Sequence, residues 1–234
     1  MSLILGIDTS STDLGIGLSD GVKRCAAFSR FMGNSHAETI AQAVASTLAS
    51  CGRSPGEVTH LAISCGPGSF TGLRIGIAFA KGFCLTTPVK VLPLSSLFIL
   101  AHGGIKSAGT VVAAVDARRD EVFWARFNAT PEGIVRLTGD CRSGAAEFRE
   151  ALSPDDTIVT DTMGYAKSSV FAFLGNRPRV FPAERYPLQR GLHCAESGAA
   201  ALASGKADGV SWQEPSAVLP CYHRDFAPPA GKAQ

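Results

Sequence analysis

The chain has 234 residues, of which 45% are hydrophobic and 18% are charged, so it is long enough for one large or two small domains with their own cores. Its formal net charge of +2 and the absence of any run of more than two Lys or Arg residues do not identify a nucleic-acid-binding protein. Any contact with RNA is therefore expected to be local or shared with a partner.

The cysteines and the first residues predict the compartment. The seven cysteines are scattered and none forms a C-x-x-C pair, which is typical of reduced thiols rather than of a disulfide framework or a zinc site. The segment Met1–Asp8 lacks the basic region of a signal peptide, and its apolar run is too short for a membrane span. We expect a cytoplasmic protein that does not associate with membranes.

The chain begins with the pattern of a three-stranded meander. An apolar strand, Leu3–Ile7, ends on Asp8-Thr9-Ser10-Ser11, a cluster of turn and hydroxyl residues. The next two strands, Gly15–Ser19 and Lys23–Arg30, are joined by Asp20-Gly21, a strong hairpin pattern.

A helix is predicted next, ending at about Ser50. Ser35 and Glu38 have the spacing of a capping box at its beginning, and Cys51-Gly52 is a typical ending. Alanines keep most of its surface thin, and its apolar stripe consists of Ile40, Val44 and Leu48.

The most informative segment is the glycine-rich turn Gly66–Gly76, between a strand at Leu61–Ser64 and a helix at about Thr71–Thr86. Such a turn directs free backbone N–H groups and a helix dipole at one point, where an anion can bind. It is neither a Walker A loop nor a dinucleotide fingerprint, because the spacing differs from both. The alternative is that the glycines serve a tight turn and close packing.

The helix after this turn has apolar residues around most of its circumference. Small residues recur every four positions and form a strip without side chains, at Gly68, Gly72, Gly76 and Ala80. Apolar side chains lie on both sides of that strip, so the helix needs covering on two sides. Its own sheet can cover one side, and we predict that a second domain or a partner covers the other.

The second half repeats the beginning of the first. After a strand at Lys90–Leu92 and a short helix at Ser96–Ala101, a small polar stretch indicates a domain boundary. Beyond it, the strand Val111–Val115 ends on Asp116 and returns, after a turn, at Glu121–Phe127. Two halves with the same beginning predict a duplicated α/β unit of the kind found in the actin-like ATPase superfamily.

Five segments occur in the order and spacing of one family: Ile4–Ser10, Ser35–Glu38, Gly66–Gly76 with Ala80-Lys81-Gly82, Pro93–Leu97 and Asp116–Phe123. The chain resembles the bacterial TsaB (YeaZ) family, an accessory subunit of tRNA threonylcarbamoyladenosine (t6A) biosynthesis. The resemblance is most specific in the first hundred residues. In the second half it rests on the Asp116 hairpin and on Pro220–Arg224, where His223 replaces the leucine that is usual in the family.

The resemblance implies an α/β fold, namely a duplicated actin-like ATPase (ASKHA) fold with two mixed-sheet α/β domains. We expect an N-terminal domain with the partner-binding helices at residues 1–104, a C-terminal domain at 105–226 and a frayed tail at 227–234.

The function implied is that of a non-catalytic subunit. TsaD, the catalytic relative, moves a threonylcarbamoyl group onto N6 of adenosine 37 in tRNAs that decode ANN codons, and the family pairs with it through the N-terminal domains. The small ATPase TsaE joins the assembly, a TsaC-type enzyme supplies the threonylcarbamoyl-adenylate, and tRNA is contacted only through the complex. In isolation, monomer and homodimer are both open.

The expected partner interface lies on the two thin helices. The residues that we assign to it are Ile40, Val44, Leu48, Gly72, Ile75, Gly76 and Phe79.

No cofactor is expected to be required, although the fold allows weak binding of ATP or ADP with magnesium in the complex. The residues for this contact are Asp8, Thr9, Ser10, Gly68 and Ser69. In an active ATPase of this superfamily, strand-end carboxylates such as Asp8 and Asp116 hold magnesium-bound water. The alternative is that each carboxylate caps its own turn. The one candidate for the adenosine side is Asp161–Gly164.

No catalytic residue and no metal site are predicted. The catalytic relative holds its metal through a His-x-Glu-x-His segment, whereas the corresponding place here, Leu92–Leu97, has Ser95 and Ser96. The five histidines are never three or four residues apart, so no helical pair of metal ligands exists. We interpret His36, at the beginning of a predicted helix, as a solvated polar residue.

Two enzyme classes were weighed as alternatives. A peptidase would need a reactive nucleophile, but Cys65, with His60 nearby in sequence, follows an apolar strand and is expected to be buried and inert. The stronger alternative is a stand-alone actin-like ATPase or small-molecule kinase.

Overall fold

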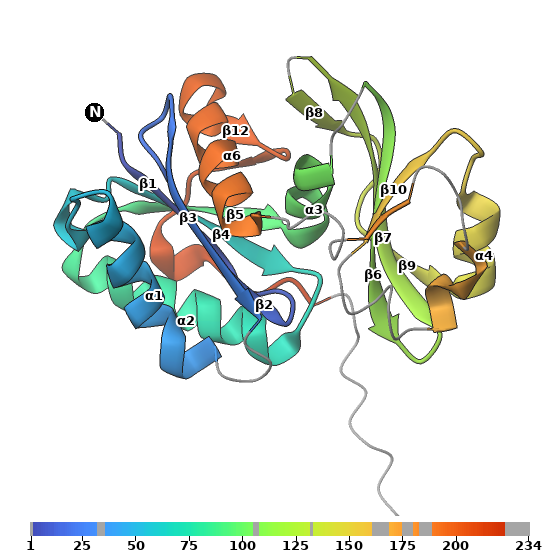
Figure 1. The fold of residues 1–234 in the computed structure, drawn as a ribbon, viewed down its shortest axis with the longest axis horizontal. Coiled ribbons are helices and arrows are strands. Elements are labelled where there is room, and N and C mark those ends of the chain that lie inside the picture. The colour runs from blue at the N-terminus through green and yellow to red at the C-terminus, as the bar shows by residue number, and fades with distance from the viewer. Residues whose placement is uncertain are drawn as a thin grey trace, which may run out of the picture.

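The computed structural model describes residues 2–31, 36–104, 108–131, 133–160, 169–174, 180–182 and 189–222. Within these ranges the chain forms two mixed β-sheets side by side, with helices on their faces (Figure 1). The predicted α/β class with two mixed sheets is confirmed. None of the helices in the described ranges has the length and apolar character needed to cross a membrane.

The first sheet has five strands in the order β3-β2-β1-β4-β5. The predicted meander is confirmed, because β1 pairs antiparallel with β2, and β2 with β3, while β4 and β5 continue the sheet in parallel. Asp20 closes the hairpin by accepting the backbone N–H groups of Val22 and Lys23. The strands are β1 (Ile4–Asp8), β2 (Asp13–Ser19), β3 (Arg24–Phe31), β4 (His60–Gly66) and β5 (Lys90–Ser95).

The second sheet repeats this plan. Its central strand, β6, pairs antiparallel with β7 and parallel with β10, as β1 does with β2 and β4. β8 and β9 both pair with β7, and β11 extends the sheet beyond β10. The two sheets therefore share the topology around their central strands that the predicted duplication implies. The strands are β6 (Gly109–Arg118), β7 (Glu121–Thr130), β8 (Gly133–Arg136), β9 (Cys141–Gly144), β10 (Thr157–Thr160) and β11 (Val180–Pro182).

Two helices cover one face of the first sheet: α1 (His36–Ser50) and α2 (Phe70–Thr86). The first and last residues of each helix agree with the prediction to within one residue. α1 ends as expected, because Gly52 takes a left-handed conformation and the Arg53 N–H donates to the Leu48 carbonyl. The capping box at Ser35 lies outside the described residues.

The opposite face of the first sheet carries α6 (Arg190–Ser204), which comes from the far end of the chain. In β2, glycines alternate with large apolar residues, and Gly15 and Gly17 face α6. A Cβ on Gly17 would lie 2.3 Å from Leu192 Cα, and one on Gly15 would lie 2.7 Å from Gly191 N. Strand and helix backbones therefore touch, which only glycine allows at these positions.

The position of α6 changes the expected domain content. We assigned residues 105–226 to the second domain, but α6 packs on the first sheet and Val91 forms a bridge with Gln213. The contact between α6 and β1 joins residues far apart in the chain, so it is not visible in the sequence. The boundary after residue 104 itself stays a prediction.

The remaining helices complete two further cores. α3 (Ser96–Gly104), three residues longer than predicted, lies between the two sheets (Figure 1) and packs on β6 and α6. α4 (Ala145–Ala151) and the 3-10 helix η2 (Ser169–Leu174) cover the outer face of the second sheet, around Phe148 and Phe171. Shorter elements are η1 (Pro55–Glu57), β12 (Lys206–Ala207), β13 (Val210–Ser211) and η3 (Pro215–Ala217).

A polar network connects the two halves. Arg136 in β8 donates to both carboxylate oxygens of Asp208, at 2.6 and 2.8 Å, and to Asp140 at 2.6 Å. Asp140 in turn accepts the hydroxyl of Ser95, at the end of β5. These charge-assisted bonds fix the β12–β13 turn and the end of the first sheet against the second sheet.

Candidate functional site

The predicted nucleotide turn begins where β1 ends, at Asp8. The Asp8 side chain is 1% exposed and forms an ion pair with Arg190, the first residue of α6. Its other oxygen accepts the Ser10 backbone N–H at 2.9 Å. Asp8 thus both caps its own turn and neutralises a buried guanidinium.

Arg190 also holds the rest of the turn. Its Nη2 atom donates to the Ser10 hydroxyl at 2.8 Å and lies 3.5 Å from the Ser96 carbonyl oxygen. Arg190 is 6% exposed, so its guanidinium is a buried cation at the end of β1. Arg190 was not predicted from the sequence, because nothing in its local pattern links it to residues near the N-terminus.

The glycine-rich loop packs directly on this turn. A Cβ on Gly68 would lie 2.3 Å from the Ser10 carbonyl oxygen, and one on Gly72 would lie 2.1 Å from the Thr9 carbonyl oxygen. The Ser69 N–H donates to Ser10 O at 2.7 Å, and the Ser69 hydroxyl caps α2 by accepting the Gly72 N–H. The structure brings together all five residues predicted to bind nucleotide, and the close-packing alternative describes their contacts.

Two further polar residues surround the turn. Burial raises the pKa of Asp13; Asp8 acts in the same direction, whereas Arg190 and His36 oppose it. His36, which we expected to be solvated, is 3% exposed, and its Nε2 atom has no hydrogen-bond partner among the described residues. That expectation was wrong, because His36 is on the inward side of the first turn of α1, whose next two residues, Ala37 and Glu38, are exposed.

The C-terminal segment returns to the glycine-rich loop. The Cys221 N–H donates to the Cys65 carbonyl at 2.7 Å. The Tyr222 hydroxyl accepts the Arg74 Nε–H at 2.8 Å, and the Arg74 guanidinium lies 3.9 Å from the centre of the Phe70 ring. The family-like ending predicted at Pro220–Arg224 therefore begins beside α2, while residues 223 and 224 lie outside the described ranges.

The partner residues predicted on α1 and α2 divide into two groups. Five of them are buried inside the chain and offer no surface to a partner: Ile40, Val44, Leu48, Gly72 and Gly76. A Cβ on Gly76 would lie 2.3 Å from the Thr9 hydroxyl, so the glycine strip faces the Asp8 turn and not a second protein. Ile75 and Phe79 are partly exposed.

A different face of the same two helices reaches solvent. Its small or apolar members are named here the α1–α2 face: Ala37, Ala41, Ala45 and Ala49 on α1, with Ala78, Gly82 and Leu85 on α2. Exposed polar residues, among them Glu38, Gln42 and Ser46, follow these alanines along α1. Leu85 is 88% exposed.

Asp116 caps its own turn, and Cys65 lies in the core. Asp116 accepts the Arg118 N–H at 2.6 Å, at the start of a turn in which residues 118, 119 and 120 are left-handed. Cys65 is buried as predicted, and burial raises the pKa of its thiol to about 12. A thiol with that pKa is not a nucleophile at neutral pH.

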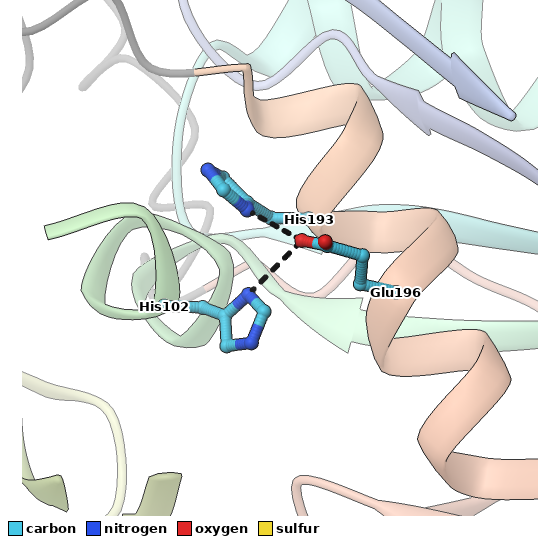
Figure 2. Close-up of side chains that lie close together, drawn as sticks. All are labelled: His102, His193 and Glu196. Carbon is cyan, nitrogen blue, oxygen red and sulfur yellow. Dashed lines mark hydrogen bonds and ion pairs between the residues drawn. The ribbon is translucent and has the colours of Figure 1, made fainter. Parts of the chain in front are cut away.

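A cluster that sequence reasoning missed lies between α3 and α6. Figure 2 shows His102 of α3 opposite His193 and Glu196 of α6. No metal site was predicted from the sequence, because Ser95 and Ser96 stand at the place of the relative's metal segment and no two histidines are three or four residues apart. The structure gathers two histidines that are distant in sequence, with one candidate ligand atom of each of the three residues within 4.8 Å of the others.

Comparisons with known proteins agree with the fold. The family model described as "TsaD: tRNA N6-adenosine threonylcarbamoyltransferase" matches residues 30–184. The "tRNA threonylcarbamoyladenosine biosynthesis protein TsaB" of Escherichia coli K12 is 36% identical over 134 residues, 56% of this chain and 57% of that protein. The protein of the same name from Bacillus subtilis is 30% identical over 156 residues, 67% of this chain and 68% of its own length. The chain thus aligns with little more than half of the E. coli relative.

Solved structures extend the likeness to nearly the whole chain. YeaZ from Pseudomonas aeruginosa matches with a TM-score of 0.76 and 25% identity, over 95% of this chain and all of that one. The activator of 2-hydroxyisocaproyl-CoA dehydratase from Clostridium difficile, with bound ADPNP, matches with a TM-score of 0.51 at 10% identity, over 86% of this chain and 96% of that one. The second likeness is one of fold alone.

Proposed function

The chain belongs to the TsaB (YeaZ) family, and we propose that it is the non-catalytic subunit that supports a TsaD-type transferase in tRNA modification. The reaction supported is the transfer of a threonylcarbamoyl group to N6 of adenosine 37 in tRNAs that decode ANN codons. The names of the E. coli and B. subtilis relatives, which place them in threonylcarbamoyladenosine biosynthesis, support the pathway. The proposal places the protein in the cytoplasm and gives it access to tRNA only through the complex.

One observation carries the non-catalytic part of the proposal, namely the buried ion pair between Asp8 and Arg190. An ATPase of this fold needs that carboxylate for magnesium-bound water. Here a guanidinium already forms an ion pair with it, and the glycine-rich loop contacts the turn without room for even a Cβ at Gly68. Nucleotide binding at this turn, if it occurs in the complex, is therefore proposed to be weak and not to support turnover.

The residues at the place of the catalytic relative's metal segment support the same reading. Ser95 donates its hydroxyl to Asp140, and Ser96 is fully buried at the start of α3. Neither offers a histidine or a carboxylate to a metal. The match to a model named for the transferase is thus interpreted as common descent of the fold rather than common chemistry.

The partner surface is proposed to be the α1–α2 face. Short side chains allow another helix to approach closely, and Leu85 gives the face an exposed apolar anchor. Ile75 and Phe79, which are partly exposed on α2, would lie at its edge. We propose that a TsaD-type protein docks here through its own helices, that a TsaE-type ATPase joins the pair, and that a second copy of the chain occupies the face when TsaD is absent.

Reconstitution tests the function. The purified chain is combined with TsaD, TsaE and TsaC-type proteins and an ANN-decoding tRNA, and t6A is measured by nucleoside mass spectrometry. We expect t6A only when both the chain and the TsaD-type protein are present. Equal formation of t6A without the chain would contradict the proposal.

The alternative, a stand-alone ATPase or small-molecule kinase, predicts a different result. It requires steady-state ATP hydrolysis by the chain alone, and it requires Asp8→Asn to abolish that hydrolysis. We expect no turnover by the isolated chain before or after this substitution.

A further inference from the structure

Two histidines and one glutamate converge between α3 and α6. His193 and Glu196 lie on one face of α6, three residues apart, and His102 lies opposite them on the last turn of α3 (Figure 2). From this convergence we propose that His102, His193 and Glu196 bind one divalent transition-metal ion, and that Zn²⁺ fits the donor set best. The proposal is independent of the accessory function argued above.

The distances fit a three-ligand site with small movements. His193 Nδ1 lies 3.0 Å from Glu196 Oε2, and His102 Nδ1 lies 4.0 Å from the same oxygen. Ligand atoms around a tetrahedral Zn²⁺ are about 3.3 Å apart, given Zn–N and Zn–O bonds of about 2.0–2.2 Å. A metal ion would replace the proton shared by His193 and Glu196, and a small rotation of His102 would bring its Nδ1 atom to the ion.

One buried nitrogen atom of the cluster is available to a ligand. His102 Nδ1 is buried and has no hydrogen-bond partner among the described residues, although it faces the Glu196 carboxylate. Buried polar atoms are almost always paired in native proteins, with protein, water or an ion. A metal ion bound to His102 Nδ1 would satisfy this atom and hold the carboxylate at the same time.

A neighbouring residue orients the glutamate. Arg24, in β3, pairs with Glu196 Oε1 and leaves Oε2 directed at the two histidines. Ligating carboxylates are commonly held in this way by a second residue, which fixes their orientation. Arg24 also brings a positive charge near the ion, but its side chain is 64% exposed, so solvent screens that repulsion.

The three ligand atoms indicate which metal ion fits, and the exposure of the side chains indicates whether water can reach it. Two imidazoles and one carboxylate suit Zn²⁺ better than the hard ions Mg²⁺ and Ca²⁺, which prefer oxygen ligands. The side chains of His102, His193 and Glu196 are 26%, 12% and 21% exposed, so water can reach a fourth coordination position. The bound ion would fix α3 to α6 in the layer between the two sheets.

The test is a Zn²⁺ titration of the reduced, metal-free chain by calorimetry. We expect one Zn²⁺ per chain and a rise in melting temperature. His102→Gln, His193→Gln and Glu196→Gln should each weaken binding about tenfold or more. His60→Gln is the matched control, because His60 is a partly exposed histidine that packs on Trp212, away from the cluster.

Two measurements on the unaltered chain keep the test decisive if a variant fails to fold. Co²⁺ should give the visible spectrum of nitrogen and oxygen ligands, without thiolate charge-transfer bands. Nitrogen-15 NMR should show that the Nδ1 resonances of two histidines move on addition of Zn²⁺. The absence of stoichiometric binding, thiolate bands, or equal loss of affinity in His60→Gln would overturn the proposal.

Discussion

The guanidinium of Arg190 contacts the carboxylate of Asp8, so the first residue of α6 is paired with the last residue of β1. Both side chains are buried, at 6% and 1% exposure. The pair joins α6 to the central strand of the first sheet.

Arg190→Ala is therefore expected to destabilise the fold strongly. The substitution leaves the Asp8 carboxylate buried without a cation, and breaking a buried pair in this way typically costs about 3–5 kcal/mol. Denaturant unfolding followed by circular dichroism measures the loss. Arg142→Ala is the matched control, since it removes a more exposed pair with Glu121 and should cost about 1 kcal/mol or less. Equal losses of unfolding free energy in the two variants would show that the buried Asp8–Arg190 pair stabilises the fold no more than the exposed pair does.

A second prediction concerns the contact between β2 and α6. Gly17→Ala places a methyl group 2.3 Å from Leu192 Cα, so strand and helix must separate. We expect a loss of about 1–3 kcal/mol or more in the free energy of unfolding, measured by chemical denaturation. Gly82→Ala is the control, because a Cβ on Gly82 meets nothing within 4 Å and alanine favours the helix. An unchanged stability of Gly17→Ala would contradict the packing described here.

Local pattern predicted most of the elements, because their determinants lie within a few residues of each other. The Asp20-Gly21 hairpin and the helix that follows Ser69 are examples, each fixed by turn residues and short-range hydrogen bonds. The glycine-rich loop was also located correctly. Both of its interpretations could be written down from sequence, but only the contact with Ser10 favours close packing.

What could not be predicted depends on pairs that are distant in the chain. Gly17 resembles an ordinary strand glycine until Leu192 is placed against it. The contacts of Arg190 with Asp8 and of His102 with Glu196 form only because α6 packs beside β1 and α3. Five of the seven predicted partner residues are buried for a related reason. Helical periodicity identifies the apolar stripe of α1 but does not say that the sheet of the same chain covers it.

A third prediction is a pH dependence at Cys65. Burial raises the pKa of this thiol to about 12 in the folded state, against 9.0 for a free thiol. Below pH 9 both states keep the proton, and Cys65 contributes no pH dependence. Between pH 9 and 12 the unfolded state binds fewer protons, so the free energy of unfolding falls as pH rises, by about 1.4 kcal/mol per unit.

The variant Cys65→Ala isolates this contribution. Its unfolding free energy should fall less steeply above pH 9 than that of the unaltered chain. The other cysteines are present in both proteins, so the difference between the two curves reports on Cys65. In the folded chain at pH 8, Cys65 should also react with a thiol reagent more slowly than Cys25, which is exposed. Parallel stability curves above pH 9 would contradict the burial effect.

The last prediction concerns the α1–α2 face, and it separates a partner surface from an ordinary helix surface. Ala45→Glu and Leu85→Glu each place a carboxylate on the exposed side of one helix, away from the core. In the free chain these charges remain in water and should change the unfolding free energy by about 0.5 kcal/mol or less. In a complex they would be buried without a partner, which is costly, so affinity for a TsaD-type protein should fall at least about tenfold by calorimetric titration. Val135→Glu, at a 60% exposed site on β8, adds the same charge in the second half and should leave the affinity unchanged. If both helix variants bound as tightly as the control while circular dichroism showed all three folded, the partner would dock elsewhere, and the smallness of the alanine side chains on α1 would need another explanation.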